Sequence, residues 1–149
     1  MDRETVIREL RLEPLPKEGG MYRRKFKDDN SSSIYFLIEP DSPTNLHRLP
    51  WPELFHFYAG APARLHLLGP EPGEARHPVL GIGLEEGERP QMLVPAGTWQ
   101  AAETTGAWTL LGTTMAPPFD WDRFELGKRE RLLKYWPDQR EVIERHLAT

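Results

Sequence analysis

The chain has 149 residues, a formal net charge of −4 and no cysteine. This length suits a single domain, and no run of about 18 apolar residues is present that could cross a bilayer. Without cysteine, disulfides and Cys-ligated zinc or iron–sulfur sites are excluded, so a metal would need His, Asp or Glu ligands. Residues 1–4 lead into no apolar stretch typical of a signal peptide. We therefore expect a cytoplasmic protein with no membrane association.

The densest basic run is Arg23-Arg24-Lys25-Phe26-Lys27, and it stands in a chain of net negative charge. A nucleic-acid-binding protein needs a broad basic face to neutralise phosphates. We therefore expect no nucleic-acid partner, and we interpret the run as the solvated face of a strand.

Fifteen prolines and twelve glycines separate many short apolar segments. This pattern is typical of an all-β domain with frequent turns. In chain order, residues 5–10 fit a short helix, Gly19-Gly20 a turn and residues 69–74 a hairpin loop. The segments that we predict as strands are residues 21–26, 33–38, 46–49, 53–58, 64–68, 79–82, 91–94, 98–102 and 108–115.

The last part of the chain changes to helical spacing. Residues 126–134 carry apolar side chains at helical intervals, and Pro137 suits the first turn of a new helix. A further apolar stripe comprises Val142, Ile143, His146 and Leu147. We predict one domain over residues 1–149, with a β-barrel at about residues 12–118 and a helical segment at about 122–147.

The densest polar group lies in residues 46–60, which contain His47, Glu53 and His56. Strand side chains alternate between faces, so Glu53 should share one face with Phe55, while His56 should lie on the other unless a bulge reverses it. A buried carboxylate is costly unless it is paired or binds a metal. His47 is the nearest candidate partner for Glu53 in the sequence.

A second polar segment spans residues 87–100, where Pro95-x-Gly97 predicts a tight turn between strands. Trp99 and Gln100 follow this turn and should point to opposite faces. We expect one of them to face the interior and the other to face solvent or a partner subunit.

These two segments resemble the two sequence motifs of the cupin superfamily. The first has a His at 47, a Glu six residues later and an aromatic-rich strand, and the second has the Pro-x-Gly turn. Metal-binding cupins usually carry His where this chain has Gln100, and a second His where it has Leu49. The resemblance therefore implies a metal site of His47, Glu53 and Gln100 in which two usual ligands are replaced.

The rest of the chain is similar to one cupin subfamily, the cupin-5-like group, formerly a domain of unknown function. The similarity covers about residues 12–137. It implies a cupin double-stranded β-helix, or jelly-roll barrel, with one or two short C-terminal helices. It also implies a homodimer and a shape similar to the sugar-nucleotide epimerase branch of cupins. The matching stretches are residues 19–23, 33–37, 46–48, 56–60, 87–91, 94–99 and 119–126.

The function that we predict is binding of a small polar or anionic metabolite in the barrel pocket. In an epimerase- or isomerase-like enzyme, His47 would abstract a proton, Glu53 would orient it and Tyr22 would return a proton. Arg23 and Arg89 would hold an anionic ligand.

Two alternatives stay open. One is a metal-dependent cupin enzyme that uses a divalent cation on His47, Glu53 and Gln100, with His56 as an additional ligand. The other is a non-catalytic binding module for a small molecule. The residues expected to contact the ligand are Arg23, Arg89, Trp99, Gln100 and His56, whereas His66, His77 and His146 read as ordinary surface or core residues.

Overall fold

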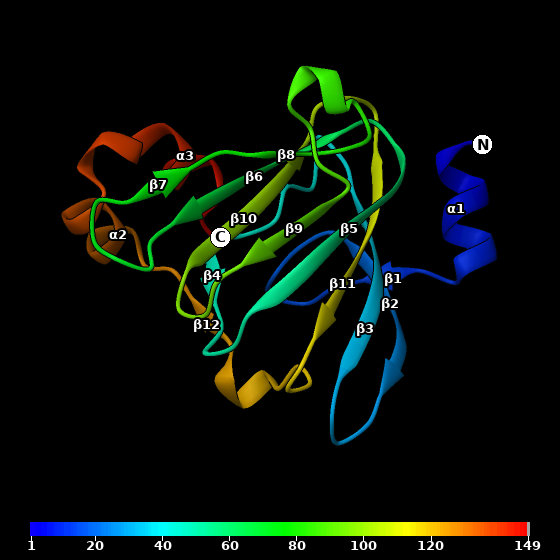
Figure 1. Ribbon diagram of the computed structural model, residues 1–149, viewed down its shortest axis with the longest axis horizontal. Helices are drawn as coiled ribbons and strands as arrows, with labels where there is room; N and C mark the ends of the chain where they lie inside the picture. The colour runs from blue at the N-terminus through cyan, green and yellow to red at the C-terminus, as the bar shows by residue number, and fades with distance from the viewer. Residues whose placement is uncertain (149) are drawn as a thin grey trace.

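The computed structural model describes residues 1–148, which form two antiparallel sheets packed face to face (Figure 1). The first sheet has the strand order β1-β2-β3-β11-β5-β9, and the second has the order β12-β4-β10-β6-β7, with β8 also paired to β6. This arrangement confirms the predicted all-β jelly roll. The strands of the first sheet are Glu13–Pro14 (β1), Met21–Lys27 (β2), Ser32–Ile38 (β3), Glu53–Gly60 (β5), Gln91–Val94 (β9) and Thr109–Met115 (β11). Those of the second are His47–Arg48 (β4), Ala63–Leu68 (β6), Ala75–Arg76 (β7), Val79–Leu80 (β8), Trp99–Thr104 (β10) and Glu125–Leu126 (β12).

Helices lie at the two ends of the chain. Helix α1 (Arg3–Leu10) confirms the short N-terminal helix, and Asp2 caps it by accepting a hydrogen bond from the backbone N–H of Thr5 at 2.9 Å. Near the C-terminus the structure has α2 (Arg129–Tyr135) and α3 (Arg140–Arg145), preceded by β12 within the segment expected to be helical. The 3₁₀ helices are Leu84–Glu86 (η1), Trp121–Arg123 (η2) and Pro137–Gln139 (η3). No helix within residues 1–148 is long and apolar enough to cross a membrane.

The main core fills the space between the sheets, because the strands alternate apolar side chains inward. The buried members of this core include Phe36, Phe55, Leu67 and Leu111. Helix α1 covers the outer face of the first sheet, and α2 and α3 cover the outer face of the second. In Figure 1 these helices accordingly lie on opposite sides of the molecule, blue against orange and red.

Strand β10 faces the main core on one side and the C-terminal helices on the other. Gln100 points inward, whereas Trp99 points outward and is buried with Leu132 and Trp136 of the C-terminal segment. The alternation of the two side chains was predicted. The surroundings of the outward one were not, because Trp99 is covered by this chain's own helices rather than by solvent or a partner subunit.

Candidate functional site

A cavity of about 430 Å³ is lined mainly by residues of the first sheet. Its deeply buried polar lining includes Glu18 and Glu53, and its exposed lining includes Arg23, Arg24 and Lys27. The two buried acidic groups therefore lie inside, and the exposed edge carries three cationic groups together with the carboxylate of Glu13. The remaining lining residues are Glu13, Leu15, Tyr22, Ser32, Ser33, Ile34, Thr113, Met115, Phe119 and Trp121.

Glu53 begins strand β5 and points into the barrel, as the predicted alternation requires. Burial raises the pKa of Glu53 to about 7, and the nearby charge of Glu18 acts in the same direction. His47 and hydrogen bonds with Thr113 and Gln100 oppose this rise. The Oε1 atom of Glu53 is buried and has no hydrogen-bond partner. This carboxyl group is therefore held within the barrel with one oxygen free to meet a ligand or a proton.

Glu18 is the second buried carboxyl group of the cavity, and burial raises its pKa to about 8. The turn that carries it is fixed to the barrel by Asn45, whose side-chain N–H donates to the Lys17 carbonyl at 2.7 Å. Gly20 adopts a φ of 77°, and a Cβ at this position would lie 2.5 Å from the Phe36 ring. Only a glycine lets the turn fold so far inward.

Sequence reasoning missed Glu18, because a glutamate beside Gly19-Gly20 reads as part of an exposed turn. The glycine pair was correctly assigned to a turn, but nothing in the local pattern indicates that the turn packs against the core. The one available signal was the pair itself, since two adjacent glycines suit a close approach between backbone and side chain.

His47 lies in strand β4 opposite Gln100 of β10 and is almost fully buried. Its Nδ1 lies 2.8 Å from the Asn45 carbonyl oxygen, which can only accept, so Nδ1 carries the hydrogen. Its Nε2 lies 3.4 Å from Glu18 Oε1. Burial lowers the pKa of His47. The structure thus brings His47, Glu53 and Gln100 together, with His47 behind Glu18 rather than among the residues that line the cavity.

The other predicted site residues divide into two groups. Tyr22 and Arg23 line the cavity. His56 lies on the opposite face of β5 from Glu53, with its Nε2 at 3.0 Å from Thr114 Oγ1. Trp99 packs under the C-terminal helices, and Arg89 is exposed and donates to the Glu88 carbonyl at 2.7 Å. None of these last three residues lines the cavity.

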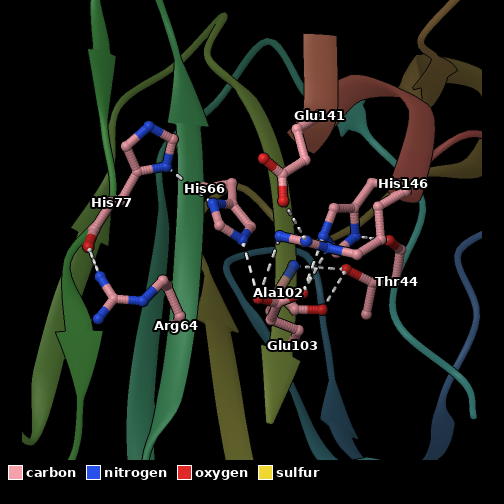
Figure 2. A network of polar contacts seen from close by, with 9 residues as sticks. Thr44, Arg64, His66, His77, Ala102, Glu103, Glu141 and His146 are labelled. Atoms are coloured by element: carbon pink, nitrogen blue, oxygen red, sulfur yellow. Dashed lines mark hydrogen bonds and ion pairs between the residues drawn. The ribbon is translucent and has the colours of Figure 1, made fainter. Parts of the chain in front are cut away.

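A second polar group lies on the outer face of the second sheet (Figure 2). It consists of His66 on β6, Glu103 on the adjacent β10 and His146 directly after α3. One ligand atom from each residue lies within 4.8 Å of the others, so this group could hold a metal ion. Sequence spacing gave no sign of it, because a helix end meets two strands only through the tertiary fold.

Two opposed antiparallel sheets around a polar cavity are the architecture of a cupin. The family described as Cupin_5, Cupin superfamily (DUF985), matches residues 4–127. The chain belongs to this family, as the sequence resemblance indicated.

Solved structures support the same assignment. A protein from Shewanella oneidensis is 31% identical, with a TM-score of 0.92 and coverage of 99% of this chain and 98% of that one. A hypothetical protein from Leishmania major is 28% identical, with a TM-score of 0.89 over the full length of both chains. Oxalate decarboxylase from Bacillus subtilis is similar in fold alone, at 14% identity and a TM-score of 0.62, over 91% of this chain and 37% of that one. No curated protein is significantly similar to the chain.

Proposed function

We propose that the protein binds a small anionic metabolite in the barrel cavity and moves a proton at one of its carbon atoms, as an epimerase or isomerase does. The observation that carries this proposal is the pair of buried carboxyl groups, Glu18 and Glu53, that face one cavity. Burial raises their pKa values to about 8 and about 7. A general acid or base works best when its pKa lies near the working pH.

Glu53 is suited to the role of base, because one of its oxygens lacks a partner inside the barrel. Glu18 is suited to the role of acid, because burial raises its pKa and favours the protonated form. Tyr22 lines the same cavity and offers a hydroxyl for the substrate. His47 contacts Glu18 and does not line the cavity. Its role in this proposal is therefore to position Glu18, and it does not abstract the proton itself.

The charge of the exposed lining indicates an anionic substrate. Arg23, Arg24 and Lys27 lie on one strand beside the cavity and attract negative charge. The acidic interior disfavours deep entry of a second negative charge, which favours a ligand with its anionic group outside and its reacting carbon inside.

Exchange of carbon-bound hydrogen in D₂O tests this function without knowledge of the product. The protein is incubated with sugar phosphates, nucleoside diphosphate sugars and 2-hydroxy carboxylates, and deuterium incorporation is followed by NMR. We expect exchange in one class of compound, its loss in Glu53→Gln and its retention in Glu13→Gln, which changes an exposed carboxylate that also lines the cavity. A compound that binds tightly but exchanges no hydrogen would instead support a non-catalytic binding module.

A metal-dependent enzyme is the second candidate function. His47 presents an imidazole Nε2 without a hydrogen, Glu53 presents a free oxygen, and Gln100 donates its amide N–H to Glu53 beside them. In the described part of the chain, however, Glu18, His47 and Glu53 do not form a group with ligand atoms within 4.8 Å of one another. Titration with Mn²⁺ or Fe²⁺, with Glu53→Gln as the control, distinguishes this candidate, since only a metal at this site is lost in that variant.

We also propose a homodimer, as the family resemblance implies. Strand β9 is an edge of the first sheet and exposes Leu93. Edge strands with apolar side chains are usually covered. Size-exclusion chromatography with light scattering tests this proposal, and a monomer at micromolar concentration contradicts it.

A further inference from the structure

The outer-face group of His66, Glu103 and His146 lies outside the barrel and takes no part in the proposed reaction. The two imidazoles are buried, with exposed fractions of 3% and 0%, and the carboxylate is half-buried. In Figure 2 both histidine rings turn toward Glu103, one from strand β6 and one from the end of α3. Two separate parts of the fold therefore converge on one carboxylate.

His146 has a defined tautomer. Its Nδ1 lies 2.8 Å from the carbonyl oxygen of Thr44, which can only accept, so Nδ1 carries the hydrogen. In the neutral ring, Nε2 then presents a lone pair, and it lies 3.4 Å from Glu103 Oε2 with no hydrogen-bond partner. A lone pair facing a carboxylate is unfavourable unless a proton or a metal cation lies between them.

His66 can adopt the same arrangement on the other side of the carboxylate. Its Nδ1 lies 2.7 Å from Nδ1 of His77, and its Nε2 lies 3.5 Å from Glu103 Oε1 without a hydrogen-bond partner. When His66 donates to His77, its Nε2 also presents a lone pair to Glu103. Histidines that bind a metal usually donate their other ring N–H to a carboxylate, a backbone carbonyl or water, which fixes the ring orientation, and His77 would take that place here.

We propose that His66, Glu103 and His146 bind a divalent transition-metal ion, with Zn²⁺ as the best fit, and that this ion fastens the C-terminal helical segment to the second sheet. Zinc prefers nitrogen and oxygen ligands in a tetrahedron, and its bond lengths place neighbouring ligand atoms about 3.3 Å apart. The two nitrogen-to-oxygen distances of 3.4 and 3.5 Å are close to this value.

The buried surroundings favour a structural role for the ion over a catalytic one. His146 follows α3, whose Ile143 is fully buried against the second sheet. A metal ion bound by His146 and by His66 and Glu103 on two strands would hold this segment in place. The 27% exposure of the Glu103 side chain gives an ion a route from solvent.

Arg145 is the charged group that competes for the same carboxylate. Its Nε lies 2.9 Å from Glu103 Oε2 and its Nη2 donates to Glu103 Oε1 at 3.2 Å, while Nη1 lies 3.6 Å from Glu141. A second cation beside the ion opposes metal binding. Arg145 is partly exposed, so its replacement should tighten the site without disturbing the core.

The test is competition for Zn²⁺ alone against a chromophoric chelator, with protein purified without added metal and then stripped. We expect one Zn²⁺ per wild-type chain. Affinity should fall by more than about 100-fold in His66→Gln and by about 10–100-fold in His77→Gln, which changes only the supporting ring. His56→Gln is the matched control, since this histidine lies outside the group. Unchanged stoichiometry and affinity in His66→Gln would overturn the proposal, as would a wild-type chain that binds no Zn²⁺.

A second measurement keeps the test decisive if His66→Gln or His146→Gln does not fold. Arg145→Met should bind Zn²⁺ several-fold more tightly than the wild type, and Zn²⁺ should raise its melting temperature more. Glu53→Gln should bind Zn²⁺ as the wild type does, which distinguishes this site from the barrel cavity. Equal or weaker binding by Arg145→Met, or loss of binding in Glu53→Gln, would contradict a site at His66, Glu103 and His146.

Discussion

The barrel cavity and the outer-face group use the same kinds of residue in opposite proportions. In the cavity, two carboxyl groups accompany one histidine, and burial raises the carboxyl pKa values to about 7 and about 8. On the outer face, two buried histidines accompany one carboxylate, and burial lowers the pKa of His66 to about 4. A cluster dominated by buried carboxyl groups retains protons, whereas one dominated by neutral imidazoles presents lone pairs. The first suits proton transfer and the second suits a metal.

Strand β10 separates the two sites and contributes to both. Gln100 points inward to Glu53, and Glu103 points outward to the histidines. A variant on one face of this strand should therefore leave the other site intact, and this independence can be measured.

The largest expected effect is the loss of catalysis in Glu53→Gln. Removal of a positioned general base usually costs about 10²–10⁴-fold in rate. We expect a fall of this size in deuterium exchange, with Zn²⁺ affinity unchanged. Glu103→Gln should give the reverse result, normal exchange and weakened Zn²⁺ binding. A variant that reduced both activities equally would show that the two sites are not independent.

The second effect concerns stability at alkaline pH. The folded-state pKa of Glu18 is raised from 4.5 to about 8 by burial, so the folded protein binds a proton that the unfolded chain releases above about pH 4.5. The stability linked to Glu18 is fully present below pH 4.5 and is lost as the pH rises through about 8.

Glu18→Gln removes this titration. Between pH 5.5 and pH 8.5 the wild type should lose on the order of 2–4 kcal/mol of unfolding free energy relative to Glu18→Gln. Urea denaturation at the two pH values measures the difference, and Glu13→Gln, at an exposed carboxylate, is the control. Parallel pH profiles for the wild type and Glu18→Gln would mean that the Glu18 carboxyl titrates normally.

Much of the fold and part of the site could be predicted from the sequence. Alternation in residues 53–58 correctly put Glu53 and His56 on opposite faces, because strand geometry is local, but it left open which way His56 faces, and the expectation that His56 contacts the ligand stays a prediction. The family motifs indicated that His47 and Gln100 belong near Glu53, and the structure pairs them in register.

The residues that the sequence did not reveal depend on contacts between distant segments. Glu18 enters the cavity because its turn packs against residues 43–45. His66 and His146 are 80 positions apart in the numbering and meet only because α3 covers the second sheet. Arg89 was expected near the cavity because it lies in a motif-like segment, but its side chain bonds within its own loop.

A smaller effect is expected at the cationic edge of the cavity. Arg23→Gln should weaken the binding of pyrophosphate roughly fivefold, because an exposed ion pair contributes little in water. Lys25→Gln removes the same charge from the same strand outside the cavity lining and should change little. Isothermal titration at low and high salt measures both variants. Equal losses in the two variants would indicate attraction by overall charge and not by the cavity.

The smallest effect is expected at His56, which the sequence predicted to contact the ligand. The test is whether either of the two sites needs this residue. His56 lies on the outer face of the first sheet, where it bonds to Thr114 and stacks on Tyr58 with ring centroids 6.4 Å apart. Glutamine can still donate to Thr114, so His56→Gln should change the unfolding free energy by less than about 1 kcal/mol. Deuterium exchange and Zn²⁺ affinity should equal those of the wild type. A marked loss of exchange in His56→Gln would mean that His56 takes part in the reaction. Catalytic groups would then lie on both faces of β5.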